Sequence, residues 1–283
     1  GKRQQGRGRL TGQHDHTHER NIFMTSSAAQ TPGAALYETS GLVDQYLEFH
    51  YGPEAFGVGN FPVACIEAVM TAIGPGRRDR CLDVGCAVGR SAIELARQFS
   101  HVDAIDYSAG FIAAAVQLQD AGSLDFRVPT EGVLTVDRRV SLADMQATEL
   151  ASRIAFATGD ACDLPADLTD YDLVFAGNLI DRLYEPQLFL TAIAERIRPG
   201  GWLAITSPYT WLEEYTPKRH WLGGYTDAAG NPMTTLAGLT AALAGSFSLH
   251  QRQDVPFVIR ETARKHQHTL AELTIWQRHC RPF

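Results

Sequence analysis

The sequence predicts an α/β fold with a mostly parallel sheet, and three observations favour it. First, short strand-like runs alternate with helical runs between residues 80 and 206, which is the pattern of consecutive βαβ units. Second, the strand-like run at 80–84 leads directly into a glycine-containing loop and then into a helix. Third, two more strand-like runs follow near the end of the chain. We therefore expect one α/β domain built around one sheet.

The composition is that of a globular protein without a membrane-spanning segment. Hydrophobic residues make up 45% of the 283 residues, which is enough to bury a large core. The sequence has no run of about 18 apolar residues and no apolar stretch behind its basic first residues, so we expect a cytoplasmic protein without a membrane partner. The net charge of −7 argues against nucleic acid as a partner.

The cysteines show neither the spacing of a metal site nor an even number for pairing. They are Cys65, Cys81, Cys86, Cys162 and Cys280. We expect five reduced thiols. His14, His16 and His18 alternate near the N-terminus, but nothing nearby supplies a fixed ligand geometry, so no metal is expected.

The N-terminal part of the chain divides into two segments. Residues 1–35 are basic at the start and lack apolar periodicity, which predicts a disordered leader, either a natural extension or a remnant of expression. From residue 36 to residue 75, apolar residues recur at helical spacing, with a second helix expected at 62–73. We expect this segment to cap a domain that covers residues 36–283.

The rest of the chain supplies the sheet. We expect strands at 80–84, 102–105, 154–158, 171–176 and 202–206, and helices at 91–99, 109–118 and 186–197. A β-hairpin at 123–142 interrupts the alternation, because two β-rich runs flank the turn-like Pro129-Thr130-Glu131-Gly132. The chain ends with two strands, at 247–255 and 270–278.

A candidate cofactor loop follows the first strand, where residues 82–90 read LDVGCAVGR. Small residues let the backbone approach a ligand closely, and the free amides of the helix that follows attract an anionic group. The dinucleotide pattern G-x-G-x-x-G fails, because from Gly85 it would require glycine at Ala87 and Arg90. The spacing of Gly85, Ala87 and Gly89 instead fits the loop of Rossmann-like class I methyltransferases, with one alanine substitution. The loop therefore predicts S-adenosylmethionine as the cofactor.

Carboxylates at the ends of the next two strands support this cofactor. Asp106 is placed to accept hydrogen bonds from both ribose hydroxyls, and Asp160 is placed to accept one from the adenine amino group. The alternative for each is a helix cap or a turn residue. The predicted cofactor-binding residues are Asp83, Gly85, Cys86, Ala87, Gly89, Asp106, Tyr107, Ser108, Asp160, Ala161, Cys162, Asn178 and Tyr51. In class I methyltransferases the sheet has seven strands and the last is antiparallel, which we also expect here.

The substrate should bind beyond the carboxyl ends of the same strands. Segments 176–182 and 207–214, and the connection between the last two strands, meet at that edge and carry acids, cations and aromatic residues. The predicted substrate-binding residues are His50, Tyr51, Asn178, Asp181, Tyr209, Trp211, Glu213 and Arg260. Such a mixture suits a small zwitterion. Tyr209 and Trp211 fit core or lid packing equally well, and Arg260 alternatively is a solvated surface charge.

Several long strings resemble one known family. They include Tyr46-Leu47-Glu48-Phe49-His50-Tyr51-Gly52, the segment 178–184 (NLIDRLY), the segment 207–214 (SPYTWLEE) and the segment 255–262 (VPFVIRET). From about residue 36 to residue 278, the chain is similar to the 4-mercaptohistidine N1-methyltransferases of ovothiol biosynthesis. The resemblance implies methyl transfer from S-adenosylmethionine to an imidazole nitrogen of a histidine-derived substrate, with S-adenosylhomocysteine as the second product.

The resemblance also implies a partner. Family members often carry an iron-dependent sulfoxide synthase before this domain, so an upstream sulfoxide or selenoxide synthase is the expected partner enzyme. The substrate is accordingly the sulfur compound or its selenium analogue, the precursor of an ovoselenol.

Our mechanistic hypothesis is in-line attack of a neutral imidazole nitrogen on the sulfonium methyl group. The protein then has to position and desolvate the reactants, and Asn178, Asp181 and Glu213 are the candidate catalytic residues that fix the tautomer. The alternatives are a methyltransferase for another small N, S or O acceptor, and a cofactor-binding module without turnover.

Overall fold

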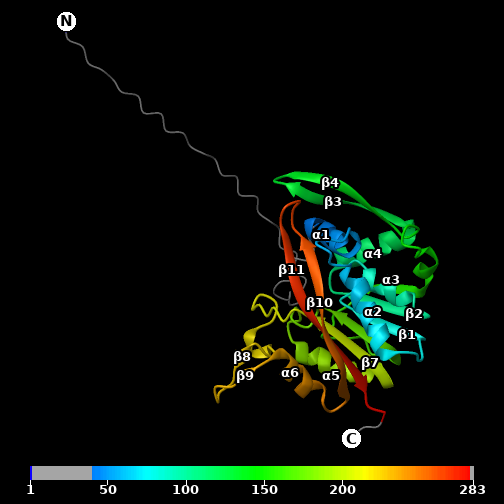
Figure 1. The fold of residues 1–283 in the computed structure, drawn as a ribbon, viewed down its shortest axis with the longest axis vertical. Helices are drawn as coiled ribbons and strands as arrows, with labels where there is room; N and C mark the ends of the chain where they lie inside the picture. The colour runs from blue at the N-terminus through cyan, green and yellow to red at the C-terminus, as the bar shows by residue number, and fades with distance from the viewer. Residues whose placement is uncertain (2–39, 281–283) are drawn as a thin grey trace.

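The computed structural model describes Gly1 and residues 40–280, and a seven-stranded sheet organises them (Figure 1). Its strands are β1 (Arg80–Val84), β2 (His101–Asp106), β5 (Ile154–Thr158), β6 (Tyr171–Gly177), β7 (Ile197–Ser207), β10 (Phe247–Arg260) and β11 (His266–Arg278). Their order in the sheet is β10-β11-β7-β6-β1-β2-β5. β11 is antiparallel to both of its neighbours, whereas the pairings from β7 to β5 are all parallel. The expected fold class is confirmed.

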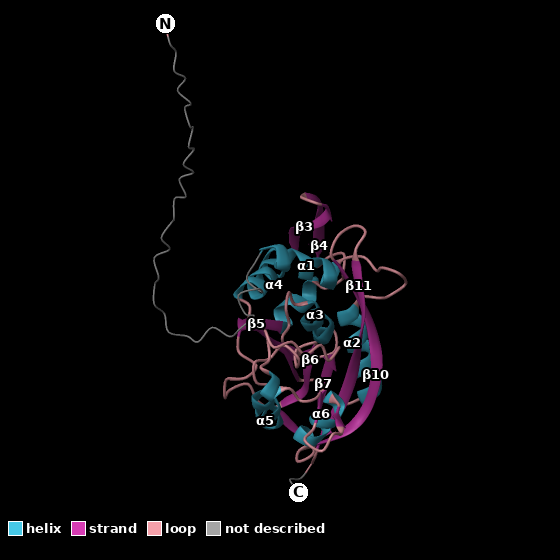
Figure 2. Ribbon diagram, turned by 90° about the vertical axis from the view of Figure 1, so that its left-hand side faces the viewer, coloured by secondary structure: helices cyan, strands magenta, loops and turns pink. Residues whose placement is uncertain are grey.

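Helices cover both faces of the sheet. They are α1 (Ser40–Tyr51), α2 (Phe61–Ile73), α3 (Arg90–Ala96), α4 (Ala109–Ala121), α5 (Pro186–Arg196) and α6 (Thr235–Leu243). One hydrophobic cluster joins the sheet to helices α1 to α4, and a second cluster joins it to α5 and α6. In Figure 2, α5 and α6 accordingly lie apart from the group formed by α1, α3 and α4. The central strand β6 is buried along almost its whole length, as expected for a parallel strand covered on both faces.

The inserted hairpin is a separate two-stranded sheet, β3 (Ser123–Glu131) and β4 (Leu134–Ser141). It extends beyond α1 and the main sheet at the top of Figure 1. β3 extends into the turn that the sequence predicted, since Pro129 lies within β3 and pairs with Thr135. Proline is tolerated there because a two-stranded ribbon has free edges. The chain reverses at the end of the predicted turn, at Gly132, whose φ is +55°.

The last two strands are longer than the sequence indicated. β10 runs to Arg260 and β11 starts at His266, so that residues 261–265 alone connect them. The register continues from Phe247–Arg278 to Arg260–His266. The pairing of β11 with β7 ends at Glu272, opposite Ser207, and the rest of this hairpin passes beyond the sheet beside α1 and α2 (Figure 1).

Shorter elements complete the described chain. They are the 3₁₀ turns η2 (Thr148–Arg153) and η3 (Lys218–His220) and the ribbon β8 (Tyr225–Thr226) with β9 (Pro232–Met233). The sequence did not predict α6, a helix of small residues whose first turn is capped by the Thr234 hydroxyl. None of the helices in residues 40–280 is long and apolar enough to span a membrane.

The N-terminal predictions lie mostly outside the described residues. The expected leader at 1–35, with His14, His16 and His18, falls there apart from Gly1. All five cysteines are free thiols, and only Cys280 is exposed.

Candidate functional site

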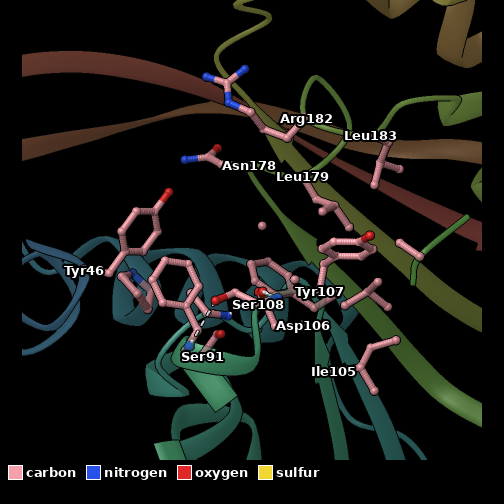
Figure 3. Close-up of a pocket in the computed structure, with 18 of the residues that line it drawn as sticks. Tyr46, Ser91, Ile105, Asp106, Tyr107, Ser108, Asn178, Leu179, Arg182 and Leu183 are labelled. Atoms are coloured by element: carbon pink, nitrogen blue, oxygen red, sulfur yellow. Dashed lines mark hydrogen bonds between the residues drawn. The ribbon is translucent and has the colours of Figure 1, made fainter. Parts of the chain in front are cut away.

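A cavity of about 220 Å³ opens at the carboxyl ends of the central strands. Its lining includes residues at the ends of β1, β2, β5 and β6, and one wall comes from α1 and the start of α2. Predicted site residues that line it are His50, Gly85, Ala87, Asp106, Tyr107, Ser108, Asp160, Ala161 and Asn178. Figure 3 shows Asp106, Tyr107 and Ser108 on one side of this space, with Asn178 and Leu179 across from them. One ligand could therefore contact residues from several strand ends at once.

The glycine-containing loop has the backbone that only small residues tolerate. Gly85 and Gly89 have φ values of +76° and +88°, in the left-handed region that favours glycine. A Cβ atom on Gly89 would lie 2.8 Å from Cζ of Phe156, and one on Gly85 would lie 3.0 Å from Cδ1 of Leu179. Ala87 shares the left-handed conformation with φ of +47°. At Gly85 and Ala87 the loop therefore borders the cavity with little side-chain bulk.

Asp106 is fixed at the end of β2 by backbone amides. Its Oδ2 accepts a hydrogen bond from the Ala87 amide and its Oδ1 accepts one from the Ser108 amide, both at 2.9 Å. The Ser108 hydroxyl then caps α4. The carboxylate is thus held in place where ribose hydroxyls are expected to bind.

Asp160 is held in a comparable way after β5. Its Oδ1 accepts a hydrogen bond from the Cys162 amide at 2.8 Å, and its Oδ2 accepts one from the Tyr184 hydroxyl at 3.2 Å. Asp160 and Ala161 line the cavity, whereas Cys162 lies outside its lining, with its thiol directed to the Glu185 carbonyl. In this arrangement Asp160 borders the cavity, where it could accept a hydrogen bond from the adenine amino group.

Three of the predicted cofactor-binding residues support the cavity without lining it. Asp83 is fully buried, and its Oδ2 accepts a hydrogen bond of 2.6 Å from Ser91, which does line the cavity. Burial raises the pKa of Asp83 to about 7. Cys86 is fully buried behind the loop, and Gly89 forms the N-terminal cap of α3.

The end of α1 is anchored directly to the cofactor loop. The Tyr51 hydroxyl donates a hydrogen bond to the Val88 carbonyl at 2.8 Å, and Arg90 donates one to the His50 carbonyl at 3.3 Å. Tyr51 therefore supports the loop from outside the cavity. The His50 side chain lines the cavity instead, and burial, followed by the nearby Arg90 charge, lowers the pKa of His50 to about 3. This imidazole is neutral at physiological pH.

Asn178 begins the segment after β6 with a left-handed backbone, φ +50°. Its side-chain Oδ1 accepts a hydrogen bond of 3.1 Å from the Thr206 hydroxyl, which directs the amide nitrogen elsewhere. In Figure 3 the Asn178 amide and the Tyr46 ring extend toward each other from opposite elements. A strained backbone at a cavity wall is typical of functional residues.

The other predicted substrate-binding residues lie outside the cavity lining. Asp181 is fully buried, where it pairs with Arg182 at 2.9 Å and accepts a hydrogen bond from the Thr210 amide. The Tyr209 hydroxyl donates to Glu272, and the Trp211 indole donates to Thr235. Two more complete this group: Glu213 is exposed, and Arg260 pairs with Glu48. Of the three candidate catalytic residues, the structure brings only Asn178 to the cavity.

Sequence reasoning missed an aromatic wall on the α1 side. Phe49, Phe61 and Phe257 meet with ring centroids 4.8 to 5.9 Å apart, and all three line the cavity. Tyr46 packs against Phe111 with centroids 4.6 Å apart. These rings come from α1, α2, α4 and β10, so that no local motif could have grouped them. Among the described residues, no cluster of His, Cys, Asp and Glu side chains could hold a metal ion.

Known protein families and sequences agree with the cofactor site. The family described as a methyltransferase domain matches residues 82–205. The chain is 28% identical over 138 residues to demethylmenaquinone methyltransferase from Clavibacter sepedonicus, covering 49% of this chain and 44% of that protein. It is 26% identical over 160 residues to a probable cobalt-precorrin-6B C(15)-methyltransferase (decarboxylating) from Methanothermobacter thermautotrophicus, covering 56% and 67%. The chain thus spans less than half of the first relative's length.

Solved structures show the same fold. One, described under conversion of a disulfide bond into a thioacetal group during echinomycin biosynthesis, is 17% identical with a TM-score of 0.52, covering 85% of this chain and 92% of that one. Another, the [4+2]-cyclase SpnF, is 17% identical with a TM-score of 0.51, covering 85% and 97%. At such identities the likeness concerns the fold alone.

The residues at the strand ends fit S-adenosylmethionine. Left-handed glycines leave no room for a Cβ at the loop, and carboxylates stand fixed at the two neighbouring strand ends. The matched segment carries this loop and both carboxylates. Residues 82–205 thus match a methyltransferase domain, and the sheet to which they belong has the Rossmann-like class I fold, with S-adenosylmethionine as the cofactor.

Proposed function

We propose that this protein methylates an imidazole ring nitrogen of a 4-mercaptohistidine-type small molecule, with sulfur or selenium on the ring, in an ovothiol-like biosynthesis. The sequence resemblance suggested this acceptor. The observation that supports it is the distribution of charged and aromatic side chains around the cavity. Among the described lining residues, Asp106 and Asp160 are the only carboxylates, and in this proposal both bind the adenosyl group. The α1 side offers aromatic rings and a neutral imidazole, and the segment after β6 adds the Asn178 amide and the Arg182 guanidinium.

Such a wall favours an acceptor whose reacting ring is flat and uncharged. Aromatic rings stack on other rings with a gain of about 0.5–1.5 kcal/mol per pair beyond the area that they bury. A cationic acceptor would meet the cofactor's positive sulfonium without a carboxylate nearby to offset the repulsion. A neutral imidazole avoids this cost and already has the lone pair that attacks.

The protein's own residues would then position the acceptor and exclude water. Bound S-adenosylmethionine supplies an activated methyl group, so a strong base is not required. Asn178 and neutral His50 offer hydrogen bonds that select one ring tautomer. Asp181 acts more remotely in this proposal, because its carboxylate holds Arg182, whose side chain lies over the Tyr215 ring. Glu213, which is exposed, has no such contact. An upstream sulfoxide or selenoxide synthase would supply the acceptor.

The test is a methylation assay with S-adenosylmethionine and three acceptors: 4-mercaptohistidine, its selenium analogue and histidine. We expect formation of S-adenosylhomocysteine together with an N-methylated product from the first or second acceptor, and much less from histidine. Asn178→Ala should lower kcat by about ten- to a hundredfold while cofactor affinity changes little. Absence of any acceptor-dependent product with all three compounds would contradict the proposal and favour another acceptor or a binding module.

A further inference from the structure

A second cavity of about 280 Å³ lies next to the first, at the C-terminal end of α1. Its walls are the C-terminal end of α1, the loop that follows it and the far end of the β10–β11 hairpin. Phe49 and Phe61 line both cavities. The two spaces therefore share one aromatic wall.

The second cavity has charged side chains beside the shared aromatic wall. Glu48 and Glu54 line it together with Arg260 and His266. The Glu48 side chain is only 5% exposed, and its Oε1 accepts a hydrogen bond from Arg260 Nη1 at 3.2 Å. The Arg260 side chain is 17% exposed, so it is open in part to a ligand. Groups of both signs thus meet in one small space.

One carboxylate oxygen in this cavity lacks a hydrogen bond. Oε2 of Glu48 is buried and forms an ion pair with Nε of Arg138 at 3.8 Å, but it has no hydrogen-bond partner among the described residues. A buried charged acceptor without a hydrogen bond is costly. Buried polar atoms left in this state call for an explanation, and a ligand that donates a hydrogen bond would provide one.

The first cavity lacks a carboxylate for the ammonium group of the proposed acceptor. A histidine-derived acceptor carries an α-ammonium group, but no carboxylate other than Asp106 and Asp160 lines the described wall of the cofactor cavity. An ammonium group placed there would be buried without a counter-charge, which costs several kcal/mol or more. Its counter-charge must come from outside that cavity.

We propose that the second cavity binds the ammonium and carboxylate groups of an α-amino acid. Glu48 and Glu54 contact the ammonium group, and Arg260 contacts the carboxylate. The amino acid is the acceptor itself, and its ring reaches past Phe49 and Phe61 into the cofactor cavity. This part of the inference rests on the proposed function.

A purely structural role for Glu48 makes different predictions. If the Glu48–Arg260 pair only clamps α1 to β10, removing its charge should destabilise the fold without selecting between ligands. Binding measurements with ligands that differ in one charged group separate the two roles. The comparison requires L-histidine, histamine, which lacks the carboxylate, and imidazole-4-propionate, which lacks the amine.

The experiment is calorimetric titration of these three compounds into the full chain saturated with S-adenosylhomocysteine. We expect L-histidine to bind best. Glu48→Gln should weaken L-histidine and histamine about tenfold and leave imidazole-4-propionate unchanged, whereas Arg260→Gln should weaken the two carboxylate-bearing ligands. Val58→Phe keeps the ion pair and should block L-histidine by filling the cavity. Glu214→Gln, an exposed site outside both cavities, is the matched control.

The outcomes separate this proposal from the proposed function. Equal methylation of 4-mercaptohistidine and 4-mercaptoimidazole, which lacks the head group, would overturn the subsite and leave the reaction standing. Charge-selective binding of L-histidine without methylation of any mercapto compound would support the subsite and contradict the reaction. If glycine bound as well as L-histidine without competing with the acceptor, the ligand would be a separate amino acid, which would overturn the link to the acceptor.

Discussion

At the scale of single residues, two buried groups near the cofactor loop have pKa values shifted in opposite directions. Asp83 has its pKa raised from 3.8 to about 7 by burial. His50 has its pKa lowered from 6.5 to about 3 by burial and by Arg90. Both shifts exist only in the folded state, so both make the free energy of unfolding depend on pH.

The signs of the two contributions differ. Between about pH 4 and pH 7 the folded state holds a proton on Asp83 that the unfolded chain has released, so stability falls as pH rises through this range. Between about pH 3 and pH 6.5 the unfolded chain protonates His50 while the folded state does not, so stability rises with pH. From pH 4 to pH 6.5 the two slopes largely cancel.

Single substitutions should therefore reveal each slope. Relative to the wild type, Asp83→Asn should make the slope of unfolding free energy more positive by about 1.4 kcal/mol per pH unit near pH 5, and His50→Phe should make it more negative by the same amount. Urea unfolding at several pH values measures both. Parallel curves for the wild type and both variants would show that neither group has the stated environment.

At the scale of elements, one buried carboxylate connects the N-terminal ends of three neighbouring strands, which lie far from the cavity. Asp172, at the start of β6, is 1% exposed and accepts hydrogen bonds from the Asp79 and Arg80 amides at 2.7 and 3.0 Å. It also pairs with Arg198 at the start of β7. The three central strands are thus joined at one buried point.

We expect Asp172→Ala to lower the unfolding free energy by about 3 kcal/mol, because it leaves buried donors and a cation unpaired. Asp125→Ala in the inserted hairpin is the control. Asp125 is 67% exposed and pairs with Arg139 at 2.8 Å, and exposed pairs contribute about 0.5 kcal/mol or less. Denaturant unfolding measures both losses. Equal losses would mean that the Asp172 contacts contribute no more than a surface pair.

At the scale of the whole molecule, the cofactor should stabilise the fold through contacts with several strand ends. S-adenosylhomocysteine at a hundredfold excess over its Kd should add about 2.7 kcal/mol to the unfolding free energy and raise the Tm by about 5–10 °C. Asp106→Ala should abolish most of this shift at the same ligand concentration. Asp163→Ala, an exposed carboxylate outside the cavity, should keep it. An undiminished rise in Tm in the Asp106→Ala variant would contradict the contact between Asp106 and the ribose.

Local patterns predicted most of the sheet and selected several residues that line the cavity. The bounds of β1 and β5 match the expected runs, and Gly85, Ala87, Asp106 and Asp160 all line the cavity. Each of these residues sits at a strand end, where position along the chain also fixes position in space. β7 starts earlier than expected. Pro199 and Gly200 resemble a turn in the sequence, which is why the strand was predicted to start after them, but both lie inside it.

The acceptor side was much less predictable. Phe257 reaches the cavity only because β10 extends past the sheet and lies beside α1, which no short-range pattern shows. Asp181 and Glu213 were chosen for their place after strands, but the chain turns there so that one is buried in an ion pair and the other faces solvent. Side-chain direction in irregular segments depends on tertiary packing rather than on sequence spacing.

The contact between α1 and β10 has a consequence for synthesis on the ribosome. Gln45 of α1 donates a hydrogen bond to the Arg260 carbonyl, and Glu48 pairs with the Arg260 guanidinium, so the first and one of the last described elements meet. During translation, α1 emerges long before its partner strand. A nascent chain can thus assemble β1, β2, β5 and β6, whose ends border the cavity, while the part of the aromatic wall that comes from β10 is still missing. Catalytic competence should arise only after the β10–β11 hairpin has left the exit tunnel.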